Sequence, residues 1–187
     1  MLPIIETQRL ILRPINKSDV YDMFEYSHRP NIGPLAGWAP HQSIEETKVV
    51  IDLMVSQGIR TGFGPFAITL KESGKMIGSI ELFNIQQHFK CELGYSLNSD
   101  YWGQGIVVEA GKAVLKWAFE QLKMVRIMVC LFDFNHQSER VCQKLHMTYE
   151  GIAHQSYLRY DGMIFDCKVY AMTTEQYFAL KEQHFYE

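Results

Sequence analysis

Apolar side chains recur with a period of two along several short runs of the chain, and this period is typical of β-strands. One such run, rich in leucine and isoleucine, is Leu10–Ile15. The other runs lie at residues 65–70, 76–85, 91–97 and 126–132, and two more strands are expected between about residues 148 and 172. Turns at Ser73-Gly74 and Asp161-Gly162 join neighbouring runs, and Asp-Gly between alternating runs is a strong hairpin signal. The pattern predicts about seven strands.

A helical period appears between these strands. Ser18 precedes an acidic first turn and is expected to cap a first helix. Ser43 and Glu46 have the spacing of a capping box for a second helix, which is expected to stop at Gly58. Two further helices are expected, one from Ile106 through Trp117 and a short one at Val141, Cys142 and Leu145.

The order of the elements is therefore β-α-α-β-β-β-α-β-α-β-β. It is neither a strict βαβ alternation nor two separate blocks, so it predicts an α+β fold. We expect a mixed, mainly antiparallel sheet of about seven strands with about four helices on its faces. The chain of 187 residues contains no repeat, low-complexity tract or linker, which predicts one domain over residues 1–187.

Composition narrows the possible functions. The chain is 47% apolar and 21% charged, with a net charge of −3, so it offers no basic field for binding nucleic acid. The four cysteines (Cys91, Cys130, Cys142 and Cys167) have no C-x-x-C spacing, and buried free thiols in a reducing compartment are expected. The seven histidines form no metal-binding pair, so no metal is expected. Without a basic leader or a run of about 18 apolar residues, the chain is expected to be soluble and cytoplasmic, with no membrane span.

The stretch DYWGQGIVVEAG at residues 100–111 carries the strongest chemical signal, because short Gly-x-Gly segments often hold phosphate. A dinucleotide fingerprint would need a third glycine where Val108 stands. A P-loop would need a hydroxyl residue where Ala113 stands. The remaining pattern is a strand, a glycine loop and the N-terminus of a long helix, whose backbone N–H groups converge on a pyrophosphate.

Residues 102–107, Trp-Gly-Gln-Gly-Ile-Val, resemble the Q/R-x-x-G-x-G/A motif of the GNAT superfamily of acetyl-CoA-dependent N-acetyltransferases. The Tyr-Trp-Gly-x-Gly form, with Glu109-Ala110 downstream, looks like the ribosomal-protein N-acetyltransferase branch, the RimJ/RimL type. Glu92–Leu97 resembles the fourth strand of that family, whose splayed backbone takes the pantetheine arm. Further matches are the N-x-x-S at Asn135–Ser138, Lys144-Leu145, Glu150-Gly151, and Asp161-Gly162 with Asp166. The element order also matches, so the resemblance covers most of the chain.

The resemblance implies a site for acetyl-CoA. The residues expected to bind it are Tyr95, Ser96, Leu97, Trp102, Gly103, Gln104, Gly105, Ile106, Val107, Val108, Asn135 and Ser138. The chain departs from the family pattern at Val107, where glycine or alanine is usual, and at Val108, where a small hydroxyl residue is common. His146 and Met147 replace a glycine and a phenylalanine. A β-branched side chain in the loop could hinder close approach of the backbone to the diphosphate.

Acetyl transfer to an amine needs a base for the nitrogen and a proton for the leaving thiolate. Glu92 is the first candidate base and Glu81, on the preceding strand, is the second. The alternative for Glu92 is a solvent-facing residue paired with a lysine. Ser138 is the family-placed acid, although Asn135 and Ser138 are also common capping residues. The residues expected to contact the acceptor are Trp38, Glu81 and Tyr157.

None of the cysteines has an adjacent histidine that would favour a covalent intermediate. We therefore expect direct attack by the amine in a ternary complex, and the branch implies a protein N-terminal α-amino group as the acceptor. The alternatives are a small amine, such as a polyamine or an antibiotic, or a catalytically silent acyl-CoA-binding module. Trp38 could equally anchor its loop to the core. The branch also implies a homodimer as one option.

Overall fold

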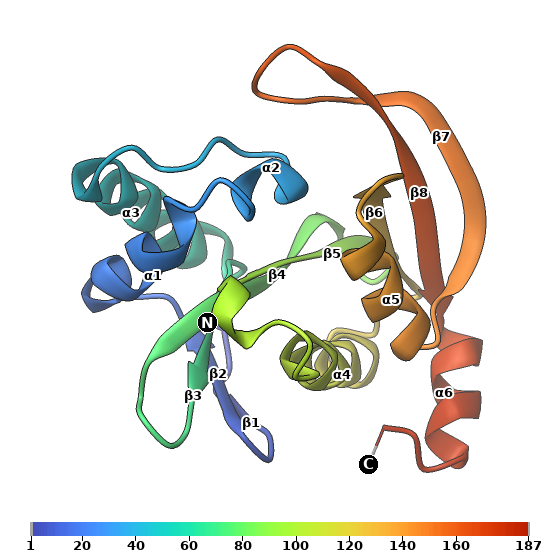
Figure 1. Cartoon of the computed structure of the whole chain (residues 1–187). Helices are drawn as coiled ribbons and strands as arrows, with labels where there is room; N and C mark the ends of the chain where they lie inside the picture. Colours follow the sequence, from blue (N-terminus) through green and yellow to red (C-terminus); the bar gives the residue numbers. More distant parts are fainter. Residues whose placement is uncertain (1, 187) are drawn as a thin grey trace. The chain divides into compact units, whose positions relative to one another are not determined.

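The computed structural model describes residues 2–186, and Figure 1 traces their path. The strands are β1 (Ile5–Glu6), β2 (Leu10–Pro14), β3 (Phe66–Leu70), β4 (Met76–Gln86), β5 (Lys90–Leu97), β6 (Arg126–Phe132), β7 (Thr148–Leu158) and β8 (Ile164–Thr173). The α-helices are α1 (Val20–Ser27), α2 (Gly33–Ala36), α3 (Ile44–Thr61), α4 (Ile106–Glu120), α5 (His136–Lys144) and α6 (Thr174–Glu182). Two 3₁₀ helices, η1 (Lys17–Asp19) and η2 (Ser99–Tyr101), precede α1 and α4 along the chain.

The strands form a mixed sheet with the hydrogen-bonded order β1-β2-β3-β4-β5-β6-β8-β7. β2 pairs antiparallel with β1 and β3, β3 pairs antiparallel with β4, and β8 pairs antiparallel with β6 and β7. β5 and β6 are parallel. The element order predicts a mixed, mainly antiparallel sheet, and this prediction is confirmed.

The chain divides into two compact units. The first comprises the residues up to Leu82 together with Gly94–Ala110, and the second comprises Phe83–Leu93 together with the residues from Gly111 onward. β4, β5 and α4 each contribute residues to both units. The organisation into one domain stays a prediction, and the two units are described in turn.

The core of the first unit lies between α1, α3 and the strands. Tyr26 of α1 and Ile51 of α3 join Met76 of β4 in one cluster of buried side chains. On α3, the residues Ile44, Thr47, Ile51, Met54 and Val55 follow the spacing of one helical face. Because this face is apolar apart from Thr47, its burial stabilises the helix more than its intrinsic propensity does.

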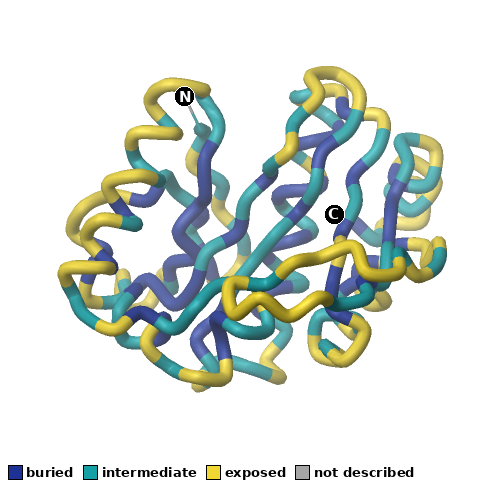
Figure 2. The backbone as a smooth tube through the Cα atoms, turned by 90° about the horizontal axis from the view of Figure 1, so that it is seen from above, coloured by how far each residue is buried: buried dark blue, intermediate teal, exposed yellow. Residues whose placement is uncertain are grey.

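The second unit is built on β6, β8 and β7. Along β6 the buried residues are Ile127, Val129, Leu131 and Phe132, whereas most of β7 is exposed (Figure 2). α6 attaches to this unit through Tyr177, which is fully buried and stacks on Phe119 of α4 with 4.8 Å between ring centroids. Aromatic burial of this kind contributes roughly 2 kcal/mol.

Two helix boundaries differ from the expectation. Asn16, rather than Ser18, caps the first helical segment. Its Oδ1 accepts a hydrogen bond from the Ser18 N–H at 2.9 Å, and its own N–H donates to the Asp19 carboxylate at 2.9 Å. The chain therefore enters α1 through a 3₁₀ turn. α3 continues past Gly58 to Thr61, and the following Gly62 has a φ of 75°, the left-handed conformation that terminates a helix.

The capping box of α3 forms only in part. Ser43 Oγ accepts from the Glu46 N–H at 3.1 Å, as expected, but the Glu46 carboxylate accepts from the Gln42 N–H at 2.7 Å instead of that of Ser43. The predicted capping box is therefore confirmed for the Ser43 side chain and wrong for the Glu46 carboxylate.

The expected element count is short by one strand and two helices. β1 has two residues, too few to show a period, and α2 is a single turn inside the Gly/Pro-rich loop. α6 opens with a capping box in which Thr173 and Gln176 exchange hydrogen bonds, a signal that the sequence contains. Cys91, Cys142 and Cys167 are buried free thiols, but Cys130 is exposed because it alternates with the buried Val129 and Leu131 along β6.

Candidate active site

The loop before α4 changes direction at two glycines. Gly103 has a φ of 76° and Gly105 a φ of 74°, a left-handed conformation that residues with a Cβ adopt at a cost of about 1–2 kcal/mol. A Cβ built on Gly103 would meet nothing within 4 Å. The loop thus presents bare backbone at this position, as close approach of a ligand to the main chain requires.

α4 leaves its first amides outside the helical ladder. Its first hydrogen-bonded turn is closed by the Glu109 N–H, which donates to the Gly105 carbonyl at 3.0 Å. The N–H groups of Ile106, Val107 and Val108 lie within that first turn, ahead of the first helical hydrogen bond, and the first amides of a helix carry a partial positive charge. Together they form a candidate binding site for an anion.

The valines of this turn direct their bulk largely into the protein. Val107 is 7% exposed and Ile106 is 2% exposed. The Val107 side chain is therefore packed in the interior. Val108 is half-buried, and the hindrance expected from the two valines stays a prediction.

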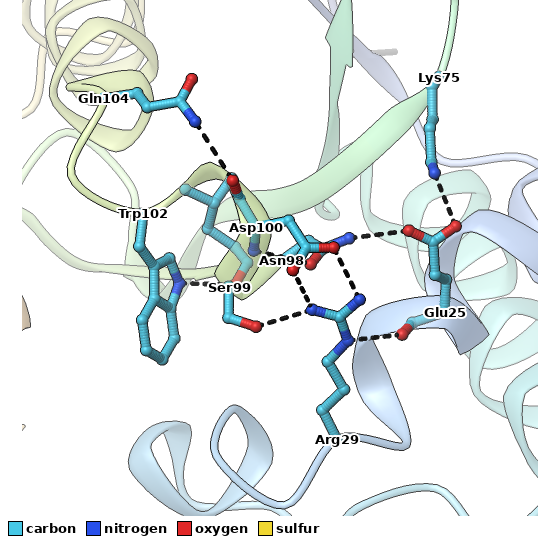
Figure 3. A network of polar contacts seen from close by, with 9 residues as sticks. Glu25, Arg29, Lys75, Asn98, Ser99, Asp100, Trp102 and Gln104 are labelled. Atoms are coloured by element: carbon cyan, nitrogen blue, oxygen red, sulfur yellow. Dashed lines mark hydrogen bonds and ion pairs between the residues drawn. The ribbon is translucent and has the colours of Figure 1, made fainter.

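A network of polar side chains holds the start of this loop (Figure 3). Arg29 donates to both carboxylate oxygens of Asp100 at 2.7 and 2.8 Å and to Ser99 Oγ at 2.8 Å. The Trp102 indole N–H donates to the Leu97 carbonyl at 2.9 Å, and Gln104 Nε2 donates to the Asp100 carbonyl at 3.2 Å. The hydrogen bond from Arg29 lowers the pKa of Asp100. A bidentate Arg–Asp pair gives the loop a fixed geometry.

The same network includes Asn98 and Glu25, which also belong to the first unit. Asn98 is fully buried; its N–H donates to the Ile77 carbonyl at 2.8 Å and its Nδ2 donates to Glu25 at 3.1 Å. Glu25 also pairs with Lys75 at 2.6 Å (Figure 3). The loop therefore begins from a residue whose polar groups are satisfied inside the fold.

A second arginine holds the end of the same loop. Arg9, in the turn between β1 and β2, donates from Nη1 to the Gln104 carbonyl at 3.0 Å and from Nε to Glu109 Oε2 at 2.7 Å. Glu109 Oε1 accepts from Thr7 Oγ1 at 2.6 Å and from the Arg9 backbone N–H at 2.8 Å. Burial would raise the pKa of Glu109, but the hydrogen bonds from Thr7 and Arg9 outweigh it and hold that pKa below its ordinary value.

The strand β5 leaves its parallel partner early. The β5–β6 pairs run from Lys90 with Arg126 to Glu92 with Met128, whereas β5 itself continues to Leu97. Along the continuing segment Ser96 Oγ lies 3.1 Å from Ser79 Oγ, and Tyr95 and Ser96 are half-buried. The segment predicted to take the pantetheine arm therefore extends beyond the part of β5 that pairs with β6.

The two candidate bases have different surroundings. Glu92 lines a hollow of about 160 Å³ with Asn84, Gln86, Lys90, Cys91 and Met128. Asn84 Nδ2 donates to Glu92 Oε1 at 2.8 Å, so this carboxylate pairs with an amide rather than with the lysine considered as its alternative. The same carboxylate also interacts with Cys130 and helps to raise the pKa of that thiol. Glu81 belongs to the first unit, and burial raises its pKa.

Asn135 and Ser138 open helix α5. Asn135 Oδ1 accepts from the Ser138 N–H at 3.1 Å, which is an N-cap and places Ser138 in the first turn as expected. Glu139, the next residue, pairs with Lys168 at 2.8 Å and accepts from the Tyr170 hydroxyl at 3.0 Å. The hydrogen bonds from Lys168 and Tyr170 lower the pKa of Glu139.

Two of the three candidates for acceptor contact are aromatic residues, one in each unit. Trp38 follows α2 and packs against the buried cluster of the first unit. A Cβ added to Gly33 would lie only 2.5 Å from the Trp38 ring, so the two residues are tightly packed. Trp38 therefore anchors its loop to the core. Tyr157 of β7 is 38% exposed and meets the Phe132 ring edge-on at 5.0 Å between centroids.

The two units divide the expected site residues. Trp38, Glu81, Tyr95–Leu97 and residues 102–108 belong to the first unit; Glu92, Asn135, Ser138 and Tyr157 belong to the second. Arg9, Arg29 and Asp100 were not expected from the sequence, because each acts through contacts about 70 to 100 residues away. Among residues 2–186, no group of three or more His, Cys, Asp or Glu side chains could hold a metal, and no helix is long and apolar enough to cross a membrane.

Solved structures place the fold among the acetyltransferases. The ribosomal-protein-S5-alanine acetyltransferase from Vibrio fischeri superposes with a TM-score of 0.76 at 26% identity, over 93% of this chain and 98% of that one. An acetyltransferase of the GNAT family from Bacillus anthracis gives a TM-score of 0.80 at 22% identity, over 92% of this chain and 99% of that one. The class is thus an acetyltransferase with a mixed α/β fold.

The sequence comparison then gives the family. Residues 9–148 match the acetyltransferase (GNAT) domain model, and the chain belongs to that family of N-acetyltransferases. Its relatives include the uncharacterized N-acetyltransferase YoaA of Bacillus subtilis, 29% identical over 92% of this chain and 97% of YoaA. They also include the [ribosomal protein uS5]-alanine N-acetyltransferase of Escherichia coli, 27% identical over 91% of this chain and 90% of that enzyme. The resemblance, the fold class and the enzyme class inferred from the sequence are confirmed.

Proposed function

We propose that the chain transfers an acetyl group from acetyl-CoA to the N-terminal α-amino group of a protein. The observation that supports acetyl-CoA as the cofactor is the start of α4, where Gly103 and Gly105 expose backbone just before the three amides that open the first helical turn. Diphosphate is an anion that such a helix start binds well. Open space where Gly103 lacks a Cβ gives a phosphate group room to reach the main chain.

The reaction needs a base that is active near neutral pH. Among the two candidates, Glu81 is the carboxylate whose pKa is raised by burial, and a carboxylate shifted toward neutrality is the better general base. Glu92 shares a hydrogen bond with Asn84, which supports a role in orienting polar groups of the acceptor or a water. We propose Glu81 as the base and retain Glu92 as the alternative.

Ser138 is the proposed proton donor for the leaving thiolate. Its N–H is fixed by Asn135, so the side chain is presented from a rigid first turn of α5. A covalent acyl-cysteine is disfavoured for the cysteine beside Glu92, because burial raises the pKa of Cys91 to about 12 and keeps it a thiol. The amine then attacks the thioester directly in a ternary complex.

The relatives support the proposed acceptor. An enzyme that covers nearly the whole chain at 27% identity is a ribosomal-protein alanine N-acetyltransferase, which supports a protein α-amino group over a small amine. A small amine, such as a polyamine or an antibiotic, is the second candidate. A silent acyl-CoA-binding module is the third candidate. It was considered partly because of Val107, and the burial of that side chain weakens this reason.

The test begins with cofactor binding. Titration calorimetry of the purified protein with CoA should give saturable binding; its absence at millimolar CoA would contradict the proposal. Mass spectrometry of reactions with acetyl-CoA then compares peptides having N-terminal alanine or serine with the same peptides blocked at the N-terminus, and with spermidine. Acetylation of the free peptides alone supports the protein acceptor, acetylated spermidine supports the small amine, and binding without any product supports the silent module.

The base is tested with Glu81→Gln and Glu92→Gln. If Glu81 is the base, Glu81→Gln should lower kcat/KM by roughly 10²-fold or more and remove the acid limb of the pH profile, while Glu92→Gln should keep that limb. The opposite result would exchange the two assignments.

A further inference from the structure

We propose that Arg9 is a positioning residue for the coenzyme A diphosphate, acting through the loop that ends at Gly105 and together with Thr7 and Glu109. The inference rests on the proposed function, since it assigns the diphosphate to the start of α4. All of these residues belong to the first unit. Arg9 lies in the turn between β1 and β2, about 95 residues before the loop that it contacts.

The guanidinium of Arg9 joins two parts of the candidate diphosphate site. Nη1 donates to the Gln104 carbonyl at 3.0 Å, and Nε donates to Glu109 Oε2 at 2.7 Å. A guanidinium is planar and its N–H groups are fixed in a fork. One side chain therefore sets the distance between the loop carbonyl and the first turn of α4.

The bond to the Gln104 carbonyl also orients an amide of the site. In a trans peptide the C=O and the following N–H point in opposite directions. A Gln104 carbonyl that points to Arg9 turns the Gly105 N–H away from Arg9. That peptide leads into Gly105, whose φ is 74°, a conformation that is strained for other residues and that Arg9 helps to hold.

The contact with Arg9 offsets the negative charge that Glu109 places in the first turn of α4. A carboxylate at this place would repel a diphosphate at the same helix end. Both of its oxygens are bound: Oε1 by Thr7 Oγ1 at 2.6 Å and by the Arg9 N–H at 2.8 Å, and Oε2 by Arg9 Nε. Arg9 thus neutralises Glu109 next to the anion site. The Glu109 side chain is 17% exposed while that of Arg9 is 43% exposed, so the pair is partly screened by solvent.

The experiment compares two acetyl donors, one with the diphosphate and one without it. Calorimetry measures the Kd of CoA for the wild-type protein, Arg9→Ala, Glu109→Gln and the double variant Arg9→Ala with Glu109→Gln. Transfer from S-acetylpantetheine, which lacks the diphosphate, is measured as kcat/KM for the same proteins. Lys71→Ala is the matched control, because Lys71, the residue after β3, pairs with Glu6 of β1 at 3.0 Å, so its side chain contacts the β1–β2 hairpin rather than the loop.

We expect Arg9→Ala to weaken CoA binding by roughly tenfold or more, because one charge-assisted bond and the charge balance are lost together. Transfer from S-acetylpantetheine should change less than about twofold, since no diphosphate is involved. Removing the unpaired carboxylate should recover part of the loss, so the double variant should bind CoA more tightly than Arg9→Ala alone. Lys71→Ala should bind CoA as the wild type does.

Two outcomes would overturn the inference. The first is an Arg9→Ala variant that binds CoA with wild-type affinity. The second is an equal loss of transfer from both donors, as a general disturbance of the fold would cause. Thermal unfolding of each variant identifies a protein that does not fold, in which case Arg9→Lys provides the test: it keeps the charge but not the fork, and should bind CoA more weakly than wild type. Failure of the wild-type protein to bind CoA would instead contradict the proposed function itself.

Discussion

Helices α4 and α5 begin in nearly the same way, and they differ in one capping hydrogen bond. In each, the fourth residue is a glutamate whose N–H closes the first turn: Glu109 bonds the Gly105 carbonyl at 3.0 Å and Glu139 bonds the Asn135 carbonyl at 3.1 Å. Each glutamate is also held by a cation and a hydroxyl, Arg9 with Thr7 in one case and Lys168 with Tyr170 in the other.

The difference lies at the cap. α5 begins at Asn135, whose side chain accepts from the amide of the third helical residue at 3.1 Å. α4 follows Gly105, which has no side chain with which to cap the corresponding amide of Val108. A capped helix start has used an amide that an uncapped one still offers to a ligand. The same local architecture therefore serves as a closed helix start in α5 and as a candidate anion site in α4.

The largest expected effect separates the side chain of Ser138 from its backbone. Ser138→Ala removes the hydroxyl but keeps the N–H that Asn135 binds, so α5 should retain its cap and its stability. If the hydroxyl protonates the leaving thiolate, kcat should fall by about 10²-fold. Steady-state kinetics and thermal unfolding measure both quantities.

Gln137→Ala is the matched control for this variant, because Gln137 is an exposed residue of the same turn. It should leave both kcat and stability near their wild-type values. An unchanged kcat in Ser138→Ala would show that the start of α5 is structural only.

The second effect closes the start of α4. Gly105→Ala places a Cβ at a φ of 74°, which costs about 1–2 kcal/mol and should shift the loop. The Kd for CoA should rise by roughly tenfold. Gly58→Ala, in the interior of α3 with nothing within 4 Å of its Cβ, should keep the Kd and raise stability by about 0.5–1 kcal/mol. An unaltered Kd in Gly105→Ala would contradict the assignment of the anion to this loop.

The comparison also explains what the sequence could predict. The Gly103–Gly105 loop and the Asn135–Ser138 cap are encoded within a few residues, so their spacing was enough to locate them. Arg9 and Glu109 are 100 residues apart in the sequence, and no local pattern joins them. Ser18 failed as a cap because Asn16, two residues earlier, competes for the same role. Hydrogen bonds between residues close in the sequence can be predicted from that sequence alone, whereas contacts that only the folded chain brings together cannot.

The third effect opens α5. Asn135→Ala removes the acceptor for the Ser138 N–H and should lower the free energy of unfolding by about 1 kcal/mol, a Tm decrease of roughly 2–4 °C. Asn135→Asp keeps an acceptor oxygen and should restore most of this loss. If Asn135→Ala is as stable as wild type, the cap does not hold α5 and the contrast with α4 loses its basis.

The smallest effect is a difference in titration between the two glutamates. Both have a pKa held below the ordinary value near 4.5, so each stabilises the fold above about pH 4.5, and that contribution is lost as the pH falls through its folded pKa. Carboxyl resonances followed by NMR should show both shifts, and Arg9→Ala should raise the pKa of Glu109 alone. CoA should do the same: a diphosphate at α4 places negative charge near Glu109, which raises its pKa, and leaves Glu139 at the capped helix unchanged. If CoA shifted Glu139 and not Glu109, the roles assigned to the two helix starts would have to be exchanged.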